Sequence, residues 1–359
     1  MEQTRSRQLG YDALKSVLKW MSVEKRQDLH NHIPSLRAIN SLLPYTIDDV
    51  RIWENELSIN RTQWAFRKNS EESNSDDDDP NQSTVSIKDL NSDKCSLDFR
   101  VNQSPDEAFE KCFNVYLKNG STIQNLDLLH VPKFLCERED PDGFKLNISR
   151  LEANDWIVDK FDSFIRFVNL DNLDDISLSL CDEEGEKFGM LGKPSLGENS
   201  WFIGIINCKN LDLELYASRS LINYYIGLRN QTLVLNQNYF DVNDLRMLIE
   251  NWKTSDRPIG TCFCLLSYYI DDIFNSLELQ DTFPVEIQHD SADTPGIGIK
   301  MEDNRDLVLY IGEHQVDEGA FQALKMEVIA SGSEKKNGDS EVSAKEADEG
   351  EPSEKRARQ

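Results

Sequence analysis

The N-terminal part of the chain has apolar side chains at helical spacing. The first four recur at positions i, i+3, i+4 and i+7, one face of a helix that starts near Tyr11. They are Leu14, Val17, Leu18 and Met21. A second helix is predicted from Val23 to Ile33. Ser35 is expected to cap a third, short helix that ends at Pro44. Its inward residues would be Leu36, Ile39, Leu42 and Leu43.

Three short helices cannot enclose a large core of their own, because each buried aliphatic side chain contributes only about 1.5–3 kcal/mol. We therefore expect residues 1–44 to pack on the rest of the chain or on a partner. The predicted partner-binding face consists of Leu14, Val17, Leu18, Met21, Leu29, Ile33 and Leu36.

Apolar residues between positions 45 and 68 predict a β-hairpin that joins these helices to the body. Asn60 and Arg61 offer its turn. The apolar positions are Ile47, Val50, Ile52, Leu57, Ile59, Trp64 and Phe66. A further strand is predicted near Leu97 to Val101, where apolar and charged residues alternate.

The clearest helix signal begins at Ser104. Serine is a good N-cap, and Pro105 suits the first helical position. The acidic side chains of Asp106 and Glu107 complement the positive end of the helix dipole. We expect this helix to end by Gly120, with an apolar stripe formed by Phe109, Phe113, Tyr116 and Leu117.

Strand and helix signals then alternate at intervals of roughly 20–30 residues. The predicted strands are Ile176–Leu180, Leu211–Leu215 and Thr232–Leu235, and the predicted helices are Trp201–Ile206, Ser218–Leu228 and Asp241–Lys253. This alternation favours parallel strands with right-handed crossovers. It resembles irregular leucine-rich repeats, and a short doubly wound sheet is the alternative.

Closely spaced apolar runs predict a β-sheet near the C-terminus. They are Thr261–Tyr268, Val285–Gln288, Gly298–Met301, Leu307–Ile311 and Leu324–Ile329. The predicted fold class is therefore a mixed α+β or α/β protein. It comprises a small three-helix unit over residues 1–44, the hairpin over 45–68 and a mixed body over 84–331.

Charge and hydropathy limit the partners. The 359 residues include 65 acidic and 39 basic ones, a net charge of −26, most of it on residues 80–329. Nucleic-acid binding is not expected, because affinity for a polyanion comes from clustered Lys and Arg. No run reaches the roughly 18 apolar residues of a membrane helix, and the polar first residues do not resemble a secretory signal. We expect an intracellular protein, cytoplasmic or nuclear, without a membrane partner.

Two segments lack the apolar residues that ordering requires. Residues 69–83 form an acidic stretch, and residues 332–359 form a charged tail without aromatic side chains. Both are predicted to be disordered. Serines beside the acids are typical of acidophilic-kinase sites, and Glu354–Arg358 resembles a nuclear-import signal. A plain acidic loop and a solubilising tail are the alternatives.

No motif for catalysis, cofactor or metal binding stands out. Gly192-Lys193-Pro194-Ser195 lacks the spacing of a phosphate loop, and its proline would remove an N–H donor. Cys262 and Cys264 are expected on one strand face as core residues rather than metal ligands. Trp252 is expected to pack between its helix and the strand from Thr261. We predict no catalytic residue, no metal and no cofactor.

The order of several motifs resembles the nematode-expanded F-box C family over about residues 9–67 and 239–329. These motifs are Tyr11–Leu18, Lys25-Arg26, Ile33–Arg37, Leu43-Pro44, Ile59–Thr62, Leu248–Lys253 and Arg257–Thr261. The family joins an F-box-like N-terminus to a domain of unknown function. The acidic stretch and the charged tail depart from the family pattern.

The resemblance implies that the N-terminal helices bind the Skp adaptor of a cullin-RING ubiquitin ligase, and that the remaining domain captures an unknown substrate protein. An F-box usually opens with Leu-Pro, where Leu9-Gly10 stands here. Our prediction is a non-enzymatic interaction module that acts as an F-box-like substrate receptor. A stand-alone binding scaffold without ligase coupling is the first alternative, and an enzyme is the second.

Overall fold

The computed structural model describes residues 10–68, 82–91, 96–138, 143–182, 205, 208–217, 220–237, 239–289, 292–316 and 319–332. Most of the acidic stretch 69–83, the tail beyond residue 332, the Gly192–Ser195 segment and nearly all of the predicted helix Trp201–Ile206 lie outside the described residues.

The centre of the molecule is a parallel β-sheet. Its strands are β1 (Thr46–Ile52), β6 (Thr122–Leu128), β7 (Asn147–Ile157), β8 (Asp175–Asp182), β9 (Asn210–Ala217), β10 (Thr232–Asn236) and β11 (Cys262–Leu266). Each of them is parallel to the next in this order. A doubly wound sheet reverses its strand order at one point. The described strands do not, so that alternative is wrong.

Antiparallel strands extend both edges. Beyond β1 lie β2 (Glu56–Ile59), β3 (Thr62–Lys68), β4 (Ser83–Asp89) and β5 (Leu97–Val101). The predicted hairpin turn between β2 and β3 is confirmed, with Asn60 in the left-handed region at φ 50°. Beyond β11 lie β15 (Gly319–Ala330), β14 (Arg305–Val316), β13 (Ala292–Lys300) and β12 (Thr282–His289). The C-terminal strands therefore continue the same sheet through the β11–β15 pair and do not form a separate one.

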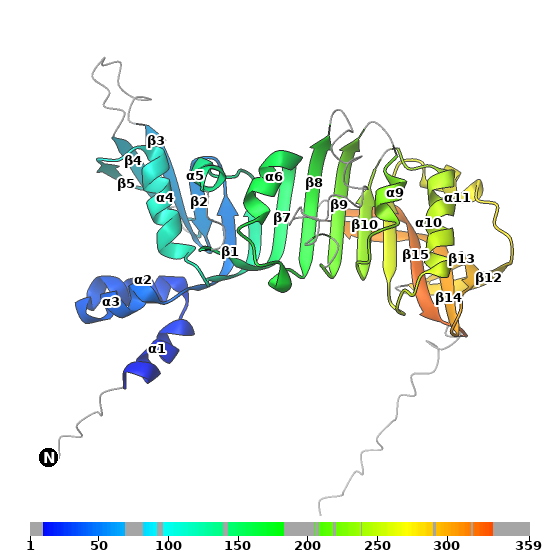
Figure 1. The fold of residues 1–359 in the computed structure, drawn as a ribbon, viewed down its shortest axis with the longest axis horizontal. Coiled ribbons are helices and arrows are strands. Elements are labelled where there is room, and N and C mark those ends of the chain that lie inside the picture. Colours follow the sequence, from blue (N-terminus) through cyan, green and yellow to red (C-terminus); the bar gives the residue numbers. More distant parts are fainter. Residues whose placement is uncertain are drawn as a thin grey trace, which may run out of the picture.

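Helices pack on one side of this sheet (Figure 1). They are α4 (Pro105–Tyr116), α5 (Lys133–Glu137), α6 (Val158–Ile165), α9 (Ile222–Tyr225), α10 (Val242–Thr254) and α11 (Ile270–Asn275), and a 3-10 turn, η2, spans Leu170–Asn172. The predicted α4 cap is confirmed as a capping box, with reciprocal bonds between Ser104 and Glu107. Among the described residues, no helix is long and apolar enough to cross a membrane.

Between the helices and the sheet lies one continuous apolar core. The buried strand residues follow a repeating pattern in which two apolar side chains are separated by one polar position, as in Leu126 and Leu128 or Leu211 and Leu213. The β-sheet register places these pairs side by side across β6 to β11. Aromatic side chains of the helices, including Phe113 and Trp252, complete the core.

The N-terminal helices are α1 (Tyr11–Lys19), α2 (Val23–His32) and α3 (Pro34–Leu42), and they project from one end of the sheet (Figure 1). The prediction that Ser35 caps α3 is wrong, because Pro34 occupies the first turn and Ile33 is the N-cap. The prediction that Leu42 lies inward is also wrong, because its side chain is 77% exposed. The inward stripe of α3 includes Asn40 instead, and at 100° per residue Leu42 falls off that stripe.

A buried arginine joins these helices to the sheet. Arg26 of α2 donates from Nε to Asn40 Oδ1 (2.7 Å), from Nη1 to the carbonyl of Pro44 (2.7 Å), and from Nη2 to the carbonyls of Asn40 (3.2 Å) and Leu43 (3.0 Å). Its guanidinium lies 3.9 Å from the centre of the Tyr45 ring, directly before β1. These bonds, together with those from Lys118 Nζ to the Asn40 and Leu43 carbonyls, satisfy carbonyls at the C-terminal end of α3.

Candidate binding surface

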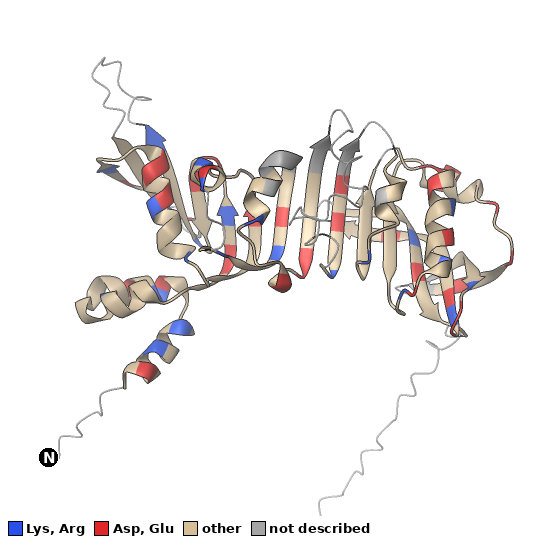
Figure 2. Cartoon of the chain, in the orientation of Figure 1, with Lys and Arg blue, Asp and Glu red and all other residues tan. Residues whose placement is uncertain are grey.

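The face of the sheet opposite the helices is polar. We call it the open face and define it by the polar side chains of β1 and β6 to β10 that alternate with the buried apolar ones; on β10 the buried, apolar Val234 interrupts them. Its members are Asp49, Arg51, Asn125, Asp127, Arg150, Glu152, Asp175, Ser177, Ser179, Asn210, Asp212, Glu214 and Asn236. The open face carries six carboxylates and two guanidinium groups, and Figure 2 shows acidic positions on each of β7, β8 and β9.

The parallel register lines these side chains up in rows across the strands. In one row, Arg51 is opposite Asp127, Asp127 is opposite Glu152, and the row continues through Ser177 to Asp212. Because neighbouring strands lie about 4.8 Å apart, side chains in a row are close enough to interact directly. The sheet therefore concentrates acidic groups that are far apart in the sequence.

Asparagine amides hold many of these carboxylates in place. Asn125 Nδ2 donates to Asp49 Oδ1 (2.9 Å) and Asn236 Nδ2 donates to Glu214 Oε1 (2.8 Å), each from a neighbouring strand. A similar bond from Asn210 holds Asp175. An amide donor leaves a carboxylate charged and uses only part of its capacity to accept hydrogen bonds. The remaining lone pairs are available to a ligand that donates hydrogen bonds.

A hollow of about 550 Å³ lies at the β1 end of the open face. Its lining residues are Asp49, Val50, Arg51, Ser58, Asn60, Leu90, Asn125, Leu126, Asp127, Arg150 and Glu152. Arg51 Nε bonds Asp127 Oδ2 at 2.7 Å, while Asp127 Oδ1 and Ser58 Oγ are buried without a hydrogen-bond partner among the described residues. Burial raises the pKa of Asp127, and the adjacent Arg51 opposes that shift.

The pKa of Asp212 shows that acidic groups on the open face repel one another. Burial, together with the charges of Glu214 and Glu152, raises the pKa of Asp212 to about 6, and Arg150 partly opposes the shift. A raised carboxyl pKa means that the folded protein disfavours the charged form. The open face therefore reduces stability near neutral pH, and a bound cation would relieve that cost. Strained electrostatics of this kind are typical of binding sites.

The arrangement of these carboxylates is suited to binding basic groups. Carboxylates fixed by amides accept hydrogen bonds from ammonium or guanidinium groups, and bidentate carboxylate–guanidinium pairs are both strong and specific. In the part of the chain that the structure describes, no group of three or more His, Cys, Asp or Glu side chains is arranged to hold a metal ion.

The residues predicted from sequence to form a partner-binding face differ in their exposure. Leu18 is only 1% exposed and is thus unavailable to a partner, because it belongs to the inner side of α1. Val17 and Ile33 are exposed, whereas the rest of the set is half-buried: Leu14, Met21, Leu29 and Leu36. The sequence argument missed Trp20, which is 91% exposed at the end of α1. Its position beyond the periodic stripe explains the omission.

The motif from Leu248 to Thr261 has a structural role. Trp252 is fully buried and meets Phe263 of β11 edge-on, which confirms the predicted core packing. The Arg257 guanidinium lies 4.1 Å from the Trp252 ring centre, and its Nη2 donates to the Leu228 carbonyl at 2.7 Å. Burial lowers the pKa of Arg257 to about 10.

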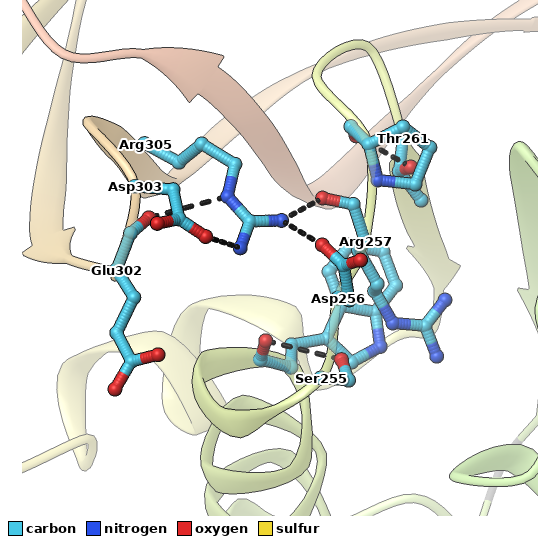
Figure 3. A network of polar contacts seen from close by, with 9 residues as sticks. Ser255, Asp256, Arg257, Thr261, Glu302, Asp303 and Arg305 are labelled. Atoms are coloured by element: carbon cyan, nitrogen blue, oxygen red, sulfur yellow. Dashed lines mark hydrogen bonds and ion pairs between the residues drawn. The ribbon is translucent and has the colours of Figure 1, made fainter.

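Arg305 extends this contact to the C-terminal strands (Figure 3). Its Nη1 bonds the carbonyl of Arg257 (2.6 Å) and the carboxylate of Asp256 (3.1 Å), and its Nη2 lies 3.6 Å from Asp303. The loop after α10 is thereby tied to the turn before β14. These motif residues therefore connect α10, the loop after it and the C-terminal strands.

The cysteine pair lies on one face of β11, as predicted, but only Cys264 is fully buried and Cys262 is half-buried. Cys264 is buried beside Val234 and Ala323, and Cys262 Sγ lies 3.7 Å from Glu327 on the same side of β11. Burial raises the pKa of both thiols to about 12, so both are protonated at neutral pH.

Comparison with known proteins gives one family. Residues 104–267 match the family described as a domain of unknown function (DUF3557). This agrees with the expectation of a domain of unknown function, but the match does not reach α1–α3. No curated protein matches the chain significantly. An S-adenosylmethionine-dependent methyltransferase from Clostridium acetobutylicum aligns at 11% identity over 51% of this chain and 66% of that chain, with a TM-score of 0.14, which does not establish a shared fold.

Proposed function

We propose that this protein is a non-enzymatic interaction scaffold that binds a basic segment of a partner protein on its open face. The observation that carries the proposal is the row of Asp127, Glu152, Ser177 and Asp212 on β6 to β9, in which burial, together with the charges of Glu214 and Glu152, raises the pKa of Asp212. Lysine or arginine side chains of a partner would neutralise these groups. Binding would then recover the stability that the charged face costs.

The repeated strand–helix units support this proposal, and we interpret them as leucine-rich-repeat-like. In solenoids of that kind each unit buries leucines on one side and presents variable polar side chains on the other. The pairs Leu126 and Leu128 and Leu211 and Leu213 follow the first half of this pattern, and Asp127 and Asp212 follow the second. A long, regular polar face suits an extended peptide better than a small molecule.

Peptide display with the full chain as bait tests the proposal. We expect the selected sequences to be rich in Arg and Lys, and their affinity to fall as salt rises, because exposed charge pairs are screened. The variant Glu152→Gln/Asp212→Asn/Glu214→Gln should bind a selected peptide at least about tenfold more weakly, which is a loss of about 1.4 kcal/mol.

A matched control removes the same number of charges from the helix side. The variant Glu137→Gln/Glu250→Gln/Asp271→Asn changes exposed acids on α5, α10 and α11. It should bind the selected peptide like the unaltered protein. Equal losses in both triple variants would show that only net charge matters, and selection of peptides without basic residues would reject the proposal.

We further propose that α1–α3 act as an F-box-like unit that binds the Skp adaptor, which would make the scaffold a substrate receptor of a cullin-RING ubiquitin ligase. The supporting observation is the exposure of large apolar side chains on these projecting helices, above all Trp20 and Leu42. Exposed apolar groups of this size are typical of protein interfaces.

Co-purification with the Skp adaptor tests this second proposal. Val17→Glu and Trp20→Glu should each abolish adaptor capture without lowering the melting temperature, because both side chains are exposed. Ser16→Glu, an exposed neighbour on α1, is the control and should leave capture unchanged. If the unaltered protein fails to capture the adaptor, the stand-alone scaffold is the correct alternative.

A further inference from the structure

Strand β5 forms one end of the sheet and has a free edge. In the part of the chain that the structure describes, it pairs with β4 on one side only. Residues 97–100 are exposed. The backbone N–H and C=O groups on an open edge can pair with another strand. At the opposite end of the sheet, β12 contains Pro284, which lacks an N–H group and is a usual means of protecting an edge.

The apolar side chains of β5 extend the core-facing side of β4, but α4 does not cover them. Leu97 is paired with Ile87 and Phe99 with Val85, two residues of β4 that pack against the core under α4. Leu97 is nevertheless 65% exposed and Phe99 is 50% exposed. An edge strand that shows both unpaired backbone groups and large apolar side chains is suited to forming an interface.

We propose that β5 pairs with β5 of a second copy of this chain, in an antiparallel arrangement centred on Phe99. The sequence Leu97-Asp98-Phe99-Arg100-Val101 is complementary to itself in this register. Asp98 of each copy faces Arg100 of the other, Phe99 faces Phe99, and Leu97 faces Val101. Opposite charges on directly facing residues stabilise a strand pair, and like charges destabilise it.

The charges also select this register. Centring the pair on Asp98 would place two carboxylates opposite each other, and centring it on Arg100 would do the same for two guanidinium groups. A shift by a single strand position changes every facing pair, so registers are strongly discriminated. Because the same patch serves both copies, the contact closes as a two-fold dimer and does not grow into a fibre. The dimer would present two open faces on the same side of one continuous sheet, and thereby bind repeated basic segments with avidity.

Sedimentation velocity of the full chain over a concentration series tests the proposal. We expect a reversible monomer–dimer equilibrium. Asp98→Arg and Arg100→Asp each turn two attractive pairs into two repulsive ones, and should raise the dimer dissociation constant by roughly tenfold or more. Glu286→Lys reverses an exposed charge on the opposite edge strand, β12, and should leave the equilibrium unchanged.

Two rescues make the test specific. The double variant Asp98→Arg/Arg100→Asp restores complementary pairs and should dimerise like the unaltered protein. An equimolar mixture of the two single variants should form a heterodimer. Asp98→Arg leaves two basic side chains on β5, and Arg100→Asp leaves two acidic ones. In the mixed pair, each basic side chain of one chain faces an acidic side chain of the other. Circular dichroism checks the fold of each variant. If a single variant misfolds, dimerisation of the double variant is the deciding result. A monomer at every concentration, or single variants that dimerise normally, would overturn the proposal.

Discussion

Replacing Arg26 with methionine tests how the N-terminal helices are attached to the sheet. Methionine fills a similar volume but donates no hydrogen bond. The Asn40 carbonyl and the Leu43 carbonyl keep a donor, because Lys118 Nζ lies 3.2 Å from each of them. The Asn40 Oδ1 and Pro44 carbonyl oxygens would lose the bonds that Arg26 makes to them.

The expected loss follows from these contacts. Each buried acceptor left without a donor costs about 1–3 kcal/mol, and the lost stacking on Tyr45 adds about 0.5–2 kcal/mol. Removing the desolvation of a fully buried guanidinium offsets part of this cost. We therefore expect Arg26→Met to lower the free energy of unfolding by about 3 kcal/mol.

Urea denaturation followed by circular dichroism measures this loss. Lys25→Met, at an exposed position beside Arg26 on the same helix, is the control and should change stability by less than about 0.5 kcal/mol. If α2 and α3 detach locally instead, hydrogen exchange should show the loss confined to residues 23–45. An Arg26→Met protein as stable as the control, with unchanged exchange, would refute the reasoning.

Three further predictions concern the body. The pKa of Asp212 is raised to about 6 in the folded protein. The stability associated with its protonated form is therefore present below about pH 4 and is lost as pH rises through 6. In denaturant titrations, Asp212→Asn should stabilise the protein by about 1–2 kcal/mol at pH 7 and have no effect at pH 4. Cys136 is exposed, whereas Cys112 and Cys208 are shielded and have pKa values raised to about 12 by burial. Mass spectrometry after brief alkylation should therefore find Cys136 modified before Cys112 and Cys208, and all seven cysteines of the chain should react once it is denatured. Gly296→Ala would place a Cβ 2.7 Å from the carbonyl oxygen of Leu309, which the β13–β14 pairing holds in place, so a fall of about 1–3 kcal/mol in unfolding free energy is expected, and an unchanged melting temperature would contradict this packing.

Local signals predict much of the secondary structure. The Ser104 cap, the Asn60 turn and the apolar alternation of β9 each depend on neighbouring residues, and the structure agrees with all three. The same signals do not predict strands β4, β6 and β7. In β6, polar residues interrupt the apolar ones, as in Thr122-Ile123-Gln124-Asn125. The apolar positions therefore follow neither the period of a helix nor that of a strand.

Pairings between distant segments could not be predicted from periodicity. β1 is parallel to β6 although about 70 residues separate them, because β2–β5 and α4 intervene and the chain then returns to the other side of β1. The Asn40 side chain points inward because its Oδ1 accepts a hydrogen bond from Arg26, which lies on another helix. Hydrophobic spacing does not encode such a bond.

The open face is visible in the sequence only in fragments. Asp212-Leu213-Glu214 predicts a strand with its leucine inward, and nothing local shows that Glu152 and Asp127 belong to the same row. Their convergence requires the strand register. The raised pKa of Asp212 depends first on its burial, which the sequence does not show, and then on Glu214 of the same strand and Glu152 of β7.

The pKa of the Asp212 carboxyl group, measured with and without a display-selected basic peptide, tests the central claim most directly. Carbon-13 NMR of labelled aspartate follows the titration, and Asp212→Asn identifies the signal. Our account predicts a pKa of about 6 in the free protein and a clear decrease when the peptide is saturating, because a nearby cation favours the charged carboxylate. An unchanged pKa in the saturated complex would show that the peptide binds elsewhere, and would contradict the assignment of the open face as the binding surface.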